Sequence, residues 1–146
     1  MFKHILVPTD GSRLSKKAEH AAIQLARRFK AHITGLHVVA VAGPVPLEAW
    51  AHGDARYGTH LDQTLAGRAG VYLQTLREAA LCAGVTCDCQ IAHGTPHQEI
   101  IRAAKRLGCD VIVMATHRKD SRDQSLLESE TTRVSALSTV PVLIWH

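Results

Sequence analysis

The sequence lacks the long apolar run that a membrane-spanning helix requires. No stretch approaches the ~20 consecutive apolar residues of such a helix, and the amino-terminal segment reaches polar Thr9 and Asp10 too early for a signal peptide. Aromatic residues make up only 4% of the chain, and none alternates with a basic cluster. We therefore expect a cytoplasmic protein that has neither a membrane nor a nucleic acid as its partner.

The sequence also lacks the common motifs of catalytic and phosphate-binding loops. It has no Gly-x-Ser-x-Gly segment and no Gly-Lys-Ser or Gly-Lys-Thr segment. Its ten histidines are spread along the chain, and none lies beside an evident nucleophile and carboxylate. The sequence therefore predicts that the protein is not an enzyme.

Four cysteines are present, and in a cytosolic protein we expect them to be free thiols. They are Cys82, Cys87, Cys89 and Cys109. Cys87 and Cys89, followed by His93 and His97, allow an alternative hypothesis of a metal or redox module. The single residue between the two cysteines is shorter than the usual spacing of structural zinc sites, which disfavours this alternative.

Apolar runs typical of strands alternate with helical apolar periodicity along all 146 residues. The predicted strands are 3–7, 32–39, 86–91, 111–115 and 140–145, and the predicted helices are 15–29, 61–83, 95–107 and 125–137. Ser12 or Ser15 can cap the first helix, and Thr95 with Gln98 forms the pattern of a capping box. This order predicts one α/β domain, residues 1–146, with a doubly wound parallel five-stranded sheet and four helices.

The run from Val111 to Met114 is apolar throughout, which is typical of a strand buried on both faces. Polar residues follow it at once, from Thr116 to Asp120. Because ligands of open α/β sheets bind beyond the carboxyl ends of the strands, we expect any ligand to lie at this edge.

Several segments, in this order along the chain, resemble the universal stress protein (UspA-like) family. They are Ile5 to Ser12, Leu36 to Val39, Gly94-Thr95-Pro96 with Ile100, Asp110 to Met114 with Thr116-His117, and Val140 to Ile144. The resemblance covers nearly the whole chain. It implies a flavodoxin-like, Rossmann-like sheet with strand order 3-2-1-4-5 and a homodimer formed through the last strand.

The resemblance also implies a set of candidate nucleotide-binding positions. They are Pro8, Thr9, Asp10, Val38, Met114, Ala115, Arg118 and Ser129. Members that bind ATP carry Gly-x-x-Gly, nine residues, and then Gly-Ser or Gly-Thr after the fourth strand. Here Ala115, Arg118 and Glu128 replace the three glycines, and only Ser129 is kept.

The replacements oppose phosphate binding to different degrees. Ala115 is a small change, whereas Arg118 places a long side chain where the backbone would wrap a phosphate. Glu128 places a carboxylate near the start of the last helix, where a phosphate would otherwise be bound. Alternatively, Arg118, Lys119 and Arg122 could bind an anion through their side chains.

We therefore expect a stress-response protein that does not bind ATP tightly and requires no cofactor. The alternative is a nucleotide-binding stress sensor with a modified phosphate loop. The apolar last strand would have a free edge unless it pairs with another chain or a loop shields it. The sequence favours pairing across a homodimer, through Val140, Val142, Leu143 and Ile144.

Overall fold

The computed structural model describes residues 1–40, 56–116 and 126–146, and the side chains of these residues except 56–66 and 126–129. The elements follow one another as β1 (His4–Pro8), α1 (Arg13–Phe29), β2 (His32–Ala40), α3 (Arg56–Cys82), β3 (Cys87–Gly94), α4 (Pro96–Leu107), β4 (Val111–Ala115), α5 (Leu126–Leu137) and β5 (Val142–Trp145). Strands and helices alternate as the sequence predicts.

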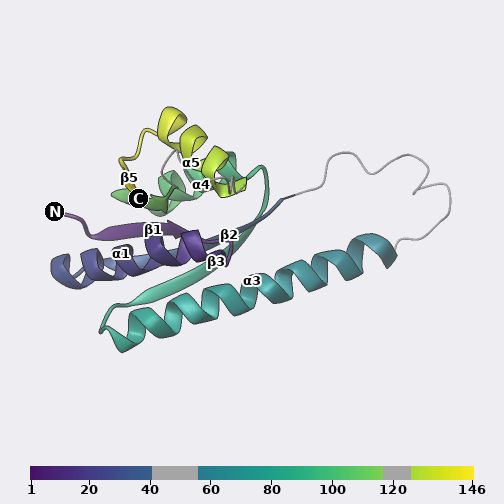
Figure 1. Ribbon diagram of the computed structural model, residues 1–146, viewed down its shortest axis with the longest axis horizontal. Helices are drawn as coiled ribbons and strands as arrows, with labels where there is room; N and C mark the ends of the chain where they lie inside the picture. Colours follow the sequence, from purple (N-terminus) through teal and green to yellow (C-terminus); the bar gives the residue numbers. More distant parts are fainter. Residues whose placement is uncertain (41–55, 117–125) are drawn as a thin grey trace.

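All strand pairs are parallel, and the sheet order is β3-β2-β1-β4-β5. The chain builds β1, β2 and β3 in one direction and then crosses β1 to place β4 and β5 on its other side. Helices α1 and α3 cover one face of the sheet, and α4 and α5 cover the other (Figure 1). The predicted fold is confirmed. The strand order changes direction between β1 and β4, and ligands of open α/β sheets bind beyond the carboxyl ends of the strands at such a point.

The two faces of the sheet form two apolar cores. In β1, Ile5 and Val7 pack toward α1, whereas Leu6 packs toward α4. In β4, Val113 faces α1 and Ile112 faces α4, and all these side chains are fully buried. The central strands are therefore buried on both faces, as their unbroken apolar runs predict.

Two helix starts differ in how their caps are formed. Ser12 caps α1, because its Oγ accepts a hydrogen bond from the Ser15 amide at 3.1 Å. Thr95 is the N-cap residue of α4, but its side chain makes no capping hydrogen bond, so the predicted capping box is wrong. Glu130 of α5 accepts a hydrogen bond from the His97 amide at 2.7 Å instead. A carboxylate from another helix thus satisfies an amide at the start of α4.

The last strand begins at Val142 rather than at Val140. The Val140 amide donates to Ser138 Oγ at 3.0 Å, and this turn keeps Val140 out of the sheet. The Pro141 carbonyl accepts the Ile112 amide at 2.9 Å and begins the contact with β4. The predicted position of Val140 within the strand is therefore wrong.

Candidate functional site

Thr9 lies just beyond β1, and all three of its polar groups have partners. Its amide donates to the Leu36 carbonyl at 2.8 Å, and its hydroxyl donates to Glu19 Oε1 at 2.5 Å. The same hydroxyl accepts the Gly11 amide at 3.2 Å. The Thr9 carbonyl is 2.8 Å from Nδ1 of His37, which must carry the proton because a carbonyl only accepts. These contacts fix the start of the β1–α1 turn to both β2 and α1.

Glu19 is a carboxyl on the inner side of α1 and is only 8% exposed. Burial raises the pKa of Glu19, while the Thr9 hydrogen bond and nearby Lys16 act in the opposite direction. Because the folded pKa lies above the unfolded value, the folded state binds the proton more readily. This contribution to stability is present at acidic pH and is lost as the pH rises through the folded pKa.

Asp10 and Gly11 complete the turn. Asp10 Oδ1 accepts the Ser12 amide at 2.9 Å, so this carboxylate braces the entry to α1. Gly11 has a φ of +75°, and a Cβ at this position would lie 2.4 Å from ring atoms of Tyr72. Gly11 is therefore required both by its backbone conformation and by the close approach of α3.

At the tip of β4, Met114 and Ala115 point to opposite faces. Met114 is 1% exposed and packs on the α4 face, whereas Ala115 is fully buried on the α1 face. The Ala115 carbonyl accepts the Thr131 hydroxyl at 3.1 Å, and the Thr116 amide donates to the Trp145 carbonyl at 2.9 Å. The methyl group of Ala115 therefore fills the core, and it occupies no space beyond the sheet edge.

The structure brings together most of the predicted site residues. Because β1 lies between β2 and β4, their carboxyl ends place Pro8, Thr9, Asp10, Val38, Met114 and Ala115 at one edge of the sheet. Arg118, Lys119 and Arg122 lie outside the described residues. Glu128 and Ser129 belong to α5, but their side chains are not described.

Two residues that support this edge were not singled out from the sequence. Glu19 has helical spacing from Ser15 and Ala22 on the buried side of α1, so the periodicity already places its carboxyl inside. Tyr72 approaches Gly11 from α3, which is far away in sequence, and no local pattern indicates that contact.

The structure does not bring the residues of the metal hypothesis together. Burial raises the pKa of Cys87 to about 12 and also raises the pKa of Cys89. His97 Nδ1 is 2.9 Å from Glu130 Oε2. Within residues 1–40, 56–116 and 126–146, no group of three or more His, Cys, Asp or Glu side chains could hold a metal ion.

The cysteines are free thiols, as predicted. In the part of the chain that the structure describes, no helix has the length and apolar character needed to cross a membrane.

The contact of Gly11 with Tyr72 gives a prediction for stability. Gly11→Ala should lower the free energy of unfolding by about 2–4 kcal/mol, from backbone strain plus the steric clash. Gly84→Ala is the matched control, because Gly84 has a φ of +74° but open space around it, and it should cost only about 1 kcal/mol. Urea unfolding of the two variants would measure both values, and equal losses would contradict the steric role of Tyr72.

Comparison with known proteins agrees with these observations. The sequence profile of the Universal stress protein family matches residues 1–146. Universal stress protein YxiE of Bacillus subtilis is 32% identical over 146 residues, which cover 99% of each chain.

Solved structures share the fold as well. UspA from Lactobacillus plantarum superposes with a TM-score of 0.83 at 23% identity, over 99% of this chain and 98% of that one. A universal stress protein solved in complex with cAMP superposes with a TM-score of 0.75 at 22% identity, over 99% and 97% of the two chains. The full-length profile match and the relative above 30% identity, together with the sheet order, show that this chain belongs to the universal stress protein family.

Proposed function

We propose that this protein acts in a stress response without binding ATP tightly and without catalysing a reaction, through contacts with other proteins. The observation that carries the proposal is the replacement of two phosphate-loop glycines by Arg118 and Glu128. The β1–α1 turn supports it, because the amide, hydroxyl and carbonyl of Thr9 are already engaged within the protein.

The expected loss of affinity can be bounded. A phosphate oxygen ~4 Å from the Glu128 carboxylate would raise the free energy by up to about 4 kcal/mol at an effective dielectric constant of ~20. A loss of two to four kcal/mol weakens binding by roughly tens to a thousandfold. Ala115 contributes nothing to this loss, because its methyl group is buried in the core.

A nucleotide-binding stress sensor is the second candidate. The carboxyl ends of β1, β2 and β4 bring Pro8, Val38 and Met114 to one edge, where the family resemblance places adenine and ribose. The relative solved with cAMP holds a nucleotide with a single phosphate. A ligand with a single phosphate would bring fewer negative oxygens near the side chains that replace the glycines.

The test is to measure adenine nucleotide in the heat-released supernatant of the purified protein, and ATP affinity by titration calorimetry. We expect no stoichiometric nucleotide and weak ATP binding. The Arg118→Gly/Glu128→Gly variant should bind ATP roughly tens to a thousandfold more tightly. The single Ala115→Gly variant is the matched control and should leave the affinity near that of the unsubstituted protein.

Stoichiometric ATP in the unsubstituted protein would overturn the proposal in favour of the sensor. An unchanged affinity in the double glycine variant would show that the two side chains do not oppose the phosphates.

We further propose that the protein forms a homodimer through the outer edge of β5. This strand lies at one end of the sheet (Figure 1). The Pro141 and Trp145 carbonyls bond to β4. Because bonding direction alternates along a strand, the amides of Val142 and Ile144 face outward and can pair with a second chain.

Ile144→Pro should therefore convert the dimer to a monomer, because it removes an outward amide while leaving the bonds to β4 in place. Ile144→Val keeps the amide and should remain dimeric. Sedimentation velocity would distinguish the two states, and a dimer that persists in the proline variant would place the interface elsewhere.

A further inference from the structure

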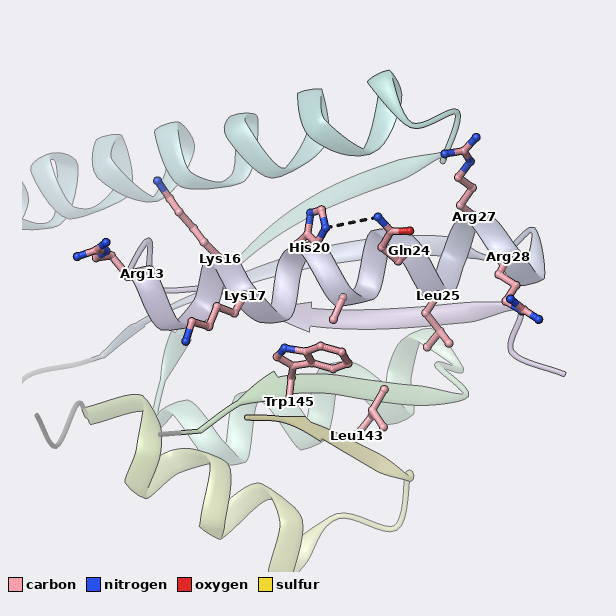
Figure 2. Close-up of a pocket in the computed structure, with 11 residues that line it drawn as sticks. Arg13, Lys16, Lys17, His20, Gln24, Leu25, Arg27, Arg28, Leu143 and Trp145 are labelled. Atoms are coloured by element: carbon pink, nitrogen blue, oxygen red, sulfur yellow. Dashed lines mark hydrogen bonds between the residues drawn. The ribbon is translucent and has the colours of Figure 1, made fainter. Parts of the chain in front are cut away.

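A groove runs between α1 and β5, and its lining residues are different from the candidate nucleotide residues. It encloses about 1220 Å³ and combines basic side chains of α1 with two apolar side chains of β5. Figure 2 shows Trp145 and Leu143 rising toward α1, with Lys17, Leu25 and Arg28 pointing down toward β5. We refer to this surface as the α1–β5 groove.

The apolar part of the groove is open to solvent. Trp145 is 50% exposed and Leu143 is 41% exposed, although both belong to a strand of the sheet. Leu25 and Ala21 of α1 face them across the groove and are half-buried. A tryptophan side chain provides a large contact area, and tryptophan is enriched where proteins bind one another.

All the charged side chains that line the groove are positive. Five cationic side chains line it: Arg13, Lys16, Lys17, Arg27 and Arg28. Lys17 and Arg28 point toward β5, whereas Lys16 and Arg27 extend away from it (Figure 2). The single acid of α1 is Glu19, which is buried and hydrogen-bonded to Thr9. None of the five cations forms an ion pair with an acidic side chain among the described residues. Lys17 and Arg28, which point toward β5, can therefore meet an acidic partner without breaking an ion pair among the described residues.

The distance between two of these cations, Lys17 and Arg28, suits a helical segment of a partner protein. Lys17 and Arg28 are eleven residues apart, which places them on the same side of α1 and about 16 Å apart along its axis. Trp145 and Leu143 lie between them in the groove (Figure 2). A partner that fits has apolar residues at its centre and acidic residues about three helical turns apart.

Other occupants fit less well. A nucleic acid would satisfy the cations, but among the described lining residues Trp145 is the only Phe, Tyr or Trp on which a base could stack. A second copy of this chain would bring a second set of the same positive charges. Pairing through β5 uses outward backbone groups in the plane of the sheet, whereas the groove lies over its face. Leu143 is the one predicted dimer residue that also lines the groove.

We propose that the α1–β5 groove binds an acidic amphipathic segment of a partner protein. This inference does not rest on the nucleotide assignment, because none of the groove residues belongs to the candidate nucleotide site.

The probe is a fluorescein-labelled synthetic amphipathic helix with leucine along one side and glutamate on both flanks. Fluorescence anisotropy would measure its binding, and we expect the affinity to fall as NaCl is raised. Lys17→Glu/Arg28→Glu should weaken binding at least about tenfold. Arg68→Glu/Lys105→Glu is the matched control, because it makes the same change in net charge at exposed positions on α3 and α4 and should leave binding unchanged.

A second readout locates the peptide. In a Trp50→Phe background, emission from Trp145 should shift to shorter wavelength when the peptide covers it, and acrylamide quenching should fall. A spectrum that does not change on saturation with peptide would place the binding elsewhere and overturn the proposal.

Three further outcomes would also overturn it. The first is an equal loss of binding in the Arg68→Glu/Lys105→Glu control, which would indicate non-specific charge attraction. The second is tighter binding of labelled oligo-dT than of the peptide, which would assign the groove to nucleic acid. The third is a change of the Lys17→Glu/Arg28→Glu variant from dimer to monomer, which would assign the groove to a second copy. If Lys17→Glu/Arg28→Glu does not fold, Lys17→Gln/Arg28→Gln replaces it with the same expected direction.

Discussion

The buried hydrogen bond between the Thr9 hydroxyl and the Glu19 carboxyl is the interaction on which the candidate site depends. It joins the end of the central strand to the first helix, and the same hydroxyl accepts the Gly11 amide. With the contacts to Leu36 and His37, it ties the turn to β2 as well. The position of Asp10, which would meet any ligand at this edge, follows from these contacts and from its own bond to the Ser12 amide.

Three candidate binding surfaces lie at different places around the one sheet. The carboxyl edge between β1 and β4 is the candidate position for a small ligand, because the strand order changes direction there. The outer edge of β5 offers backbone groups for pairing. The α1–β5 groove offers positive charge and exposed Trp145. The family fold can therefore present a candidate ligand edge and two separate candidate surfaces for other proteins.

The fold could be predicted from the sequence because apolar periodicity reports burial directly. The unbroken apolar run of β4 correctly predicted a strand, and apolar residues three and four positions apart correctly predicted helix α1. The family resemblance supplied the strand order. Contacts between distant segments could not be predicted in this way. Glu130 takes the capping role expected of Thr95, and Tyr72 lies against Gly11, and both contacts depend on how helices pack. At the site, six predicted residues share one edge, and the ligand-binding roles of all the predicted site residues remain predictions.

The most direct measurement of the central interaction is amide hydrogen exchange at Gly11 in Thr9→Val. Valine keeps the shape of threonine but can neither accept the Gly11 amide nor donate to Glu19, so exchange at Gly11 should accelerate at least about tenfold relative to the Val113 amide of β4. Thr9→Ser keeps the hydroxyl and should retain the protection of the unsubstituted protein. Exchange at Gly11 that stays unchanged in Thr9→Val would show that the turn holds its shape without this hydrogen bond, which contradicts the account.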